Sequence, residues 1–328
     1  MSQATSASEQ RPATSAKVPM RLRLKAWWNG EEIRVKGEGG SNSGAGAAAD
    51  AATGSQKGAE VVEPFVRWNE AHLEIVQTIW GSGMIGPTNP EEVKELVKPL
   101  GLNPAMSLLH LGAGLGGPGR VMTEAFGVWV TGLESERDLV KAGMALAEEA
   151  GVGKKAPVVI FDPESFEPKA ASYDCIVSFG YLFTVKNRMR LIDVLDQALK
   201  PNGQFLITDF VLPKPGLESK ALTDWMEREP DEVEPWSVEQ YKLTLEGRGL
   251  EVRIIEDRSD KLRQQVVKSW ADHMATSSQE AGDPRTSAAL VHEVELWTRR
   301  TRALEAGDLR HCRLYARRKA SANLLSDW

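Results

Sequence analysis

Five glycines lie within eight residues of the segment 106–120, MSLLHLGAGLGGPGR, at Gly112, Gly114, Gly116, Gly117 and Gly119. An apolar run precedes them and a helical pattern follows. Glycine lets the backbone turn sharply and approach a ligand closely, and the N-terminus of the following helix offers free N–H groups to an acceptor. The segment therefore predicts a loop that binds a nucleotide-like ligand.

A carboxylate stands at a matching place after the next apolar run. That run ends in VTGLESE, which puts Glu134 20 residues after Gly114. A carboxylate at this spacing can accept hydrogen bonds from ribose hydroxyls. Because the glycines also satisfy the dinucleotide pattern G-x-G-x-x-G, the spacing predicts a nucleoside but does not identify it. A solvated carboxylate at a helix N-terminus is the alternative interpretation of Glu134.

Alternating elements must position these residues. Apolar runs predict strands at 106–111, 128–133, 157–161, 173–179 and 203–210, and helical patterns fall at 117–126, 136–150 and 187–199. Alternation at this rhythm predicts a parallel sheet with helices on both faces. Past Pro213 we expect polar helical segments to about 248, a strand at 250–256, a long helical stretch near 261–306 and a last strand at 310–317.

Two helices are predicted before the sheet. Pro64, followed by apolar residues at three- and four-residue steps as far as Ile79, indicates an amphipathic helix that ends at Gly81. Asn89 and Pro90, with carboxylates in the next two positions, indicate the start of a second helix that runs to about residue 100.

Three further segments carry a family resemblance: VVIFDPESF, YDCIVSFGYLF and ALKPNGQFLITDF. With the glycine loop they resemble the class I S-adenosylmethionine-dependent methyltransferases, whose LKPGG turn leads into a strand. TIWGSGMIGPTNPEEVKELVKPLGLNPAMSLLHLGAGLGGPGR and WTRRTRALEAGDLRHCRLYARRK resemble the small-molecule subgroup that includes phosphoethanolamine, tocopherol and sterol methyltransferases. The resemblance covers about residues 63–319. It implies a Rossmann-like, doubly wound α/β sheet of seven strands with the last strand antiparallel, plus N-terminal helices.

The resemblance also implies S-adenosyl-L-methionine as cofactor, bound at the carboxyl edge of the sheet. Its contacts would be Gly112, Ala113, Gly114 and Gly116 to the methionine part, Glu134 to the ribose, Asp162 to the adenine amino group, Ser135 and Phe161 to the adenine ring, and Ser178 and Phe179 to the sulfonium end. Read from the residues alone, Asp162 before Pro163 is also a turn signal, and Ser178 and Phe179 are also compatible with plain core.

The chain departs from the family pattern at several positions. His110 stands where the family most often has Asp or Glu, and a protonated imidazole there would repel a sulfonium. The tyrosine and histidine that the phosphoethanolamine enzymes use are absent at Thr78-Ile79-Trp80 and at 209–213. The catalytic residue is therefore open, with Tyr181 and Asp209 as candidates. Candidates for binding the substrate are Trp80, Met84, Phe183, Trp225 and Trp236.

The C-terminal histidines and the cysteines offer no metal-ligand spacing. His273, His292 and His311 lack a spaced carboxylate or cysteine partner, so we expect structural or solvent-facing roles and no metal. Cys175 and Cys312 lie far apart in the sequence, which favours a reducing, cytoplasmic location. Forty basic and 46 acidic side chains give a net charge of -6, so no nucleic-acid partner is expected.

Composition also divides the chain. We expect a disordered tail at 1–19, a short basic and aromatic element at 20–36, a flexible linker at 37–60 and a tail at 321–328. The methyltransferase domain would span 61–320, with an N-terminal helical segment at 61–105, a cofactor-binding core at 106–210 and a substrate, lid and C-terminal part at 211–320. Residues 20–28 either form a strand on the main domain or make a peripheral contact with an anionic membrane surface.

The leading hypothesis is methyl transfer from S-adenosylmethionine to a small or lipid-like, amphiphilic molecule, with N-, O- or C-methylation open. A nonenzymatic binding module of the same fold is the alternative, motivated by His110 and the missing histidines. A nicotinamide oxidoreductase is the third, and it is weaker because only one nucleotide-binding half precedes the proline-glycine turn. The sequence leaves the oligomeric state open.

Overall fold

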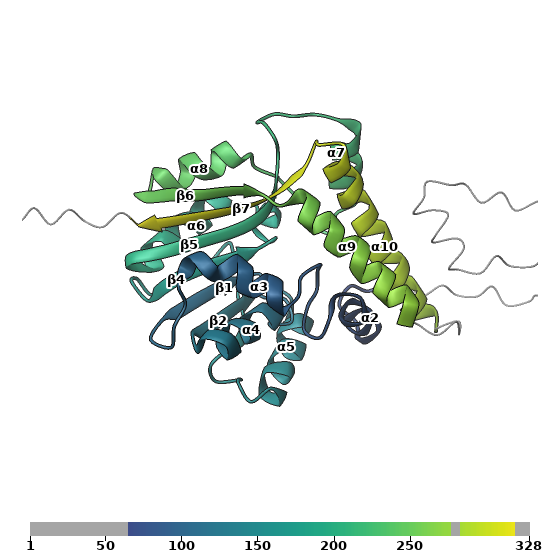
Figure 1. Ribbon diagram of the computed structural model, residues 1–328, viewed down its shortest axis with the longest axis horizontal. Coiled ribbons are helices and arrows are strands. Elements are labelled where there is room, and N and C mark those ends of the chain that lie inside the picture. The colour runs from purple at the N-terminus through teal and green to yellow at the C-terminus, as the bar shows by residue number, and fades with distance from the viewer. Residues whose placement is uncertain (1–64, 277–282, 319–328) are drawn as a thin grey trace, which may run out of the picture. The chain divides into compact units, whose positions relative to one another are not determined.

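The computed structural model describes residues 65–276 and 283–318 (Figure 1). The expected tails, the linker and the basic and aromatic element at 20–36, with its proposed membrane contact, lie outside the described residues. All described residues fall in one compact unit that begins at Val62.

A seven-stranded sheet forms the centre of this unit, in the order β3-β2-β1-β4-β5-β7-β6. The strands are β1 (Ser107–Leu111), β2 (Trp129–Glu134), β3 (Val158–Ile160), β4 (Tyr173–Phe179), β5 (Leu199–Val211), β6 (Leu250–Asp257) and β7 (Arg310–Arg318). Strands β1 to β5 pair in parallel, whereas β7 lies antiparallel to both β5 and β6. The expected doubly wound sheet with an antiparallel last strand is confirmed.

Helices cover the sheet and one of its edges. They are α2 (Glu70–Trp80), α3 (Pro90–Val97), α4 (Gly117–Phe126), α5 (Arg137–Glu149), α6 (Arg188–Ala198), α7 (Lys220–Met226), α8 (Val238–Glu246), α9 (Ser259–Thr276) and α10 (Pro284–Glu305), with short 3-10 turns at Lys98–Leu100 and Leu182–Thr184. Helices α2, α9 and α10 pack on one another beyond the carboxyl ends of the parallel strands (Figure 1). They form a helical cap over the sheet edge at which α/β folds bind ligands.

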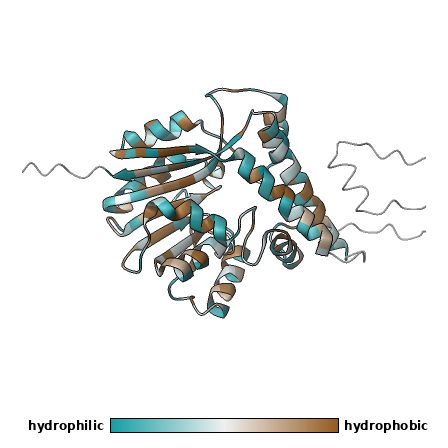
Figure 2. Ribbon diagram, viewed as in Figure 1, coloured by the Kyte–Doolittle hydropathy of each residue, from teal (hydrophilic) through white to brown (hydrophobic). Residues whose placement is uncertain are grey.

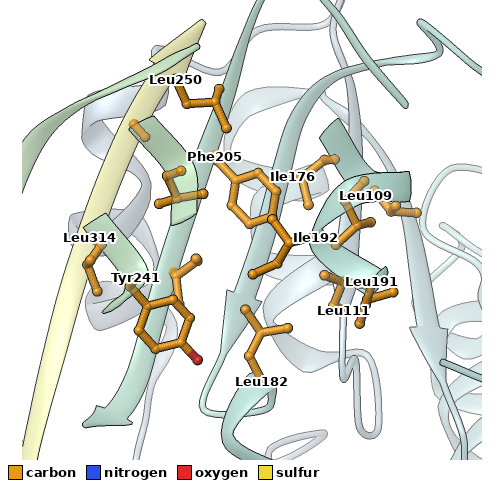
Figure 3. Close-up of a cluster of buried hydrophobic side chains, with 14 of the residues drawn as sticks. Leu109, Leu111, Ile176, Leu182, Leu191, Ile192, Phe205, Tyr241, Leu250 and Leu314 are labelled. Carbon is orange, nitrogen blue, oxygen red and sulfur yellow. The ribbon is translucent and has the colours of Figure 1, made fainter. Parts of the chain in front are cut away.

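The apolar runs of the sequence form the buried strands of the core. The central strands are covered on both faces, so β1 buries Leu108, Leu109 and Leu111 completely. Figure 3 shows Leu191 and Ile192 of α6 packed against this sheet, beside Phe205 of β5. In Figure 2, α9 and α10 each carry hydrophobic and hydrophilic residues side by side, as helices with one buried face do.

The predicted start of the first helix was wrong. Helix α2 begins at Glu70 and not near Pro64, because Trp68 has a φ of 61° and the Asn69 side chain caps the helix by accepting from the His72 N–H at 2.8 Å. The stretch 261–306 forms two helices, α9 and α10. None of the helices within the described ranges is both long and apolar enough to cross a membrane.

Candidate functional site

A cavity of about 660 Å³ lies at the carboxyl edge of the sheet. This volume is in the range of small-molecule sites. Its sheet side is formed by residues that follow or end β1, β2 and β4: His110, Gly112, Ala113, Glu134, Ser135, Phe179 and Tyr181. Its helical side is formed by residues of the cap and of the segment after α7: His72, Glu229, His292, Glu293, Trp297 and Arg300. The cavity thus extends from the predicted nucleoside site at the sheet to the helical cap.

The glycine loop is shaped for close contact at two positions. Gly112 has a φ of 63°, and a Cβ there would lie 2.4 Å from a ring carbon of Tyr181. A Cβ on Gly117 would lie 2.3 Å from the carbonyl oxygen of Gly83, which accepts the Gly117 N–H at 3.0 Å. Gly112 and Ala113 line the cavity, whereas Gly114 and Gly116 are not among its lining residues. Gly114 and Gly116, which both have a positive φ, therefore shape the turn.

Glu134 connects the glycine loop to the end of β2. Its Oε2 accepts the Gly114 N–H at 2.8 Å and its Oε1 accepts the Glu136 N–H at 3.0 Å. The residue is only 4% exposed, and burial raises the pKa of its carboxyl group, although the backbone donors oppose this effect. The Ser135 hydroxyl also donates to Oε1 at 3.5 Å, so at least one of the roughly four lone-pair positions of the carboxylate remains for a hydroxyl donor from a ligand in the cavity.

His110 lies on β1 and faces the same cavity. It is 1% exposed, its ring centroid is 5.2 Å from that of Phe179, and neither ring nitrogen has a partner among the described residues. Burial lowers the pKa of the imidazole to about 4, so the ring is neutral near pH 7. The repulsion of a sulfonium that a protonated histidine would cause is therefore absent. Buried nitrogens without partners also indicate a site for a ligand or water.

Tyr181 contributes a protonated phenol to the sheet side. Burial raises the pKa of its hydroxyl group, so Tyr181 can donate a hydrogen bond at neutral pH but is a poor base. Phe161 packs beside it with ring centroids 6.1 Å apart and does not line the cavity. Of the predicted sulfonium contacts, Phe179 lines the cavity, whereas Ser178 is fully buried in β4.

Asp162 occupies an exposed turn after β3. Its Oδ2 accepts from Ser165 Oγ at 2.7 Å and its Oδ1 accepts the Glu164 N–H at 2.9 Å, and these bonds lower the pKa of the carboxyl group. The side chain does not line the cavity. This is the arrangement that an Asp-Pro turn predicts, and it leaves the adenine contact without geometric support.

Asp209, a catalytic candidate, lies outside the cavity-lining set in a buried polar network. Tyr241 donates to its Oδ2 at 2.5 Å, and burial raises the pKa of the carboxyl group to about 6. Arg188, also buried, donates to the Glu234 carbonyl at 2.6 Å and lies 4.6 Å from the ring of Trp236. Asp209 thus connects β5 to α8 through Tyr241, and Trp236 packs on Tyr241 from the segment before α8.

The remaining substrate candidates divide into lining and supporting residues. Met84 and Phe183 line the cavity. Trp225 is 1% exposed and packs 6.0 Å from Phe183, between ring centroids, behind the lining residues. Trp80 is also buried, and its Nε1 donates to Glu293 Oε2 at 3.2 Å. Both tryptophans therefore position residues that line the cavity.

Sequence reasoning missed most of the helical side. His292 and His311 line the cavity, although the sequence indicated only structural or solvent-facing roles for them, and Glu293 was not singled out. One signal was present in the sequence. Glu293 is spaced four residues from both Ala289 and Trp297, so it interrupts the buried face of α10 with a charge.

Comparisons with known proteins agree with the fold. Phosphoethanolamine N-methyltransferase 1 of Arabidopsis thaliana is 24% identical over 209 residues, which cover 64% of this chain and 41% of the relative. The 27-O-demethylrifamycin SV methyltransferase of Amycolatopsis mediterranei is 26% identical over 213 residues, which cover 61% of this chain and 78% of the relative. The chain thus spans about two fifths of the plant relative.

A solved structure has the same fold. Phosphoethanolamine N-methyltransferase 2 of Haemonchus contortus, in complex with S-adenosyl-L-methionine, superimposes with a TM-score of 0.65 at 17% identity, covering 75% of this chain and 56% of that one. The family model described as a methyltransferase domain matches residues 87–254, just over half of the chain and all of the cofactor-binding core expected from the sequence. The chain belongs to the methyltransferase domain family.

Proposed function

We propose that the protein transfers a methyl group from S-adenosyl-L-methionine to a small or amphiphilic molecule, with the cofactor on the sheet side of the cavity and the acceptor on the helical side. Glu134 carries the proposal. Its carboxylate is fixed by the Gly114 N–H at 2.8 Å, lines the cavity and keeps a free lone pair. This is the placement that a ribose diol requires.

The residues present fit the cofactor. Gly112 and Ala113 line the cavity where the methionine part would lie, and Glu134 would accept from the ribose hydroxyls. When bound, the cofactor supplies a methyl group on a positively charged sulfur. The neutral His110 ring, with its unpartnered nitrogens, and the ring of Phe179 would border that charge without repelling it.

The chain's own contribution is binding, alignment and exclusion of water. Methyl transfer is an in-line displacement, for which holding the two reactants in line supplies most of the acceleration. Tyr181 stays protonated and can orient an acceptor by donating a hydrogen bond. The helical cap and the segment that includes Glu229 close the cavity on the side away from the sheet.

The acceptor of the Arabidopsis relative, named as phosphoethanolamine, is not carried over, because Thr78-Ile79-Trp80 and residues 209–213 lack the tyrosine and histidine of that subgroup. A cytoplasmic location also belongs to the proposal. It rests on Cys175 and Cys312, which are both buried and free.

Calorimetry with S-adenosylhomocysteine tests the proposal. We expect one site per chain with saturable binding in a folded sample. No heat of binding at millimolar ligand would contradict the proposal, and an increase in NADH fluorescence on mixing would point instead to a nicotinamide-binding protein.

A further inference from the structure

Glu293 of α10 is a buried carboxylate in the wall of the helical side. It is 3% exposed and lines the cavity. His72 Nε2 lies 3.0 Å from its Oε1, and Trp80 Nε1 donates to its Oε2 at 3.2 Å. Both partners belong to α2, so the packing of α2 on α10 fixes the carboxylate in one orientation.

The tautomer of His72 follows from its other nitrogen. The Trp68 backbone N–H donates to Nδ1 at 3.1 Å, so Nδ1 carries a lone pair and no proton. The proton of the neutral ring must then lie on Nε2, where it is donated to Glu293. Both groups that hold Glu293 are therefore uncharged, and its negative charge is not neutralised by them.

The neighbouring cations are already paired. Arg300 donates from Nε and Nη2 to the two oxygens of Glu229, each at 2.7 Å, and Arg67 pairs with Asp231 at 2.8 Å. His292 does not supply a charge, because burial lowers the pKa of its imidazole. Among these described residues Glu293 therefore has no hydrogen-bonded cation of its own, and only the longer-range attraction of Arg300 reaches it.

A metal ion is a poor match for the same cluster. The ligand atoms of His72, His292 and Glu293 lie within 4.8 Å of one another. However, coordination by His72 Nε2 would move the ring proton to Nδ1, where it would collide with the Trp68 N–H that now donates there. An organic ammonium ion needs no such rearrangement, because it can donate a hydrogen bond to the carboxylate as it stands.

Aromatic rings complete the surroundings. Trp297 lines the cavity one helical turn from Glu293, with its ring centroid 5.1 Å from that of Trp80. Trp68 also lines the cavity and stacks on His72 at 4.8 Å between centroids. Arginines of the chain already lie over both indoles, Arg300 at 4.7 Å from the Trp297 ring and Arg67 at 5.0 Å from the Trp68 ring. The two rings therefore add apolar surface around the carboxylate.

We propose that Glu293, held by His72 and Trp80 and flanked by Trp297, forms a subsite for the cationic nitrogen of the methyl acceptor. The acceptor is thereby an organic ammonium compound. This inference rests on the proposed function, since it assigns the acceptor to the helical side of the same cavity.

Matched probes test the subsite directly. n-Butylammonium, 1-butanol and butyrate have the same length and differ in charge, and their dissociation constants can be measured by saturation-transfer NMR on the full chain, in EDTA, with and without S-adenosylhomocysteine. We expect n-butylammonium to bind about ten- to a hundredfold more tightly than 1-butanol, because 1-butanol lacks the positive charge that the carboxylate attracts. Butyrate should bind most weakly, because its negative charge is repelled by the carboxylate. Equal affinities in the unmodified chain would overturn the inference without any variant.

Two variants locate the effect. Glu293→Gln removes the charge and should bring the two affinities within about threefold, whereas Glu295→Gln changes an exposed carboxylate on the same helix and should leave the preference intact. A preference that persists in folded Glu293→Gln, or that requires an added divalent ion, would overturn the subsite. Binding of S-adenosylhomocysteine without an ammonium preference overturns only this inference. An ammonium preference without that binding overturns only the proposed function.

Discussion

Replacing Glu134 by Gln removes the charge and one acceptor oxygen from the wall of the cavity. In the structure the carboxylate already accepts two backbone N–H groups, at 2.8 and 3.0 Å, and the Ser135 hydroxyl at 3.5 Å, and it keeps a lone pair for a ligand. Charge-assisted hydrogen bonds to a ribose diol are worth about 1.5–3 kcal/mol, so Glu134→Gln should weaken S-adenosylhomocysteine binding about ten- to a hundredfold.

The same contacts predict a second effect that the sequence did not reveal. Glu134→Ala leaves the N–H groups of Gly114 and Glu136 without their acceptor, so this variant should also lose about 1–3 kcal/mol of unfolding free energy. Calorimetry gives the affinity, and urea unfolding gives the stability. Glu148→Gln, on the exposed face of α5, is the control that should change neither. Equal affinity in Glu134→Gln and the parent chain would refute the ribose assignment.

Three further predictions concern the core and the loop. Arg258→Ala should lower the unfolding free energy in urea by about 1–3 kcal/mol, because Glu92, whose side chain is 9% exposed, loses its partner at 2.6 Å and keeps only Lys261 at 2.7 Å. The exposed Arg253→Ala should lower it by less than about 1 kcal/mol. The His110 imidazole has a pKa of about 4 in the folded chain, below the unfolded value near 6.5, so the unfolded chain binds more protons and stability should fall as the pH falls from about 6.5 to 4. His110→Gln should make the urea midpoint less dependent on pH across that window. An unchanged pH dependence in the variant would show that His110 titrates normally. Gly112→Ala should abolish measurable S-adenosylhomocysteine binding, because the new Cβ would lie 2.4 Å from the ring of Tyr181 and displace it. Gly216 also has a positive φ, of 67°, but no atom lies within 4 Å of its added Cβ, so Gly216→Ala should reduce only the melting temperature.

The fold could be predicted because its determinants are local. Apolar runs of strand length, the glycine loop after 106–111 and the helical patterns between them each fix one element, and the right-handed connection of parallel strands restricts the order. Glu134 was found for the same reason, since a strand end fixes its place relative to the glycine loop. The start of α2 was missed because the apolar spacing continues through residues that the Asn69 cap excludes from the helix.

The helical side could not be predicted because its contacts are long-range. His72 and Glu293 are 221 residues apart, and nothing in either local pattern shows that they meet. The tryptophans were assigned to the substrate by residue type, but Trp80 and Trp225 support lining residues from behind. Residue type indicates that an aromatic ring is valuable, whereas only packing decides whether it faces a ligand or the core.

Transfer of a labelled methyl group tests the central claim most directly. The folded chain is incubated with S-adenosylmethionine labelled in its methyl group and with a cell extract, and the label is followed into small-molecule and macromolecular fractions. The account predicts label in a low-molecular-weight product, reduced in Glu134→Gln as cofactor affinity falls. A chain that binds S-adenosylhomocysteine but transfers label to no fraction would contradict methyl transfer and show a binding module instead.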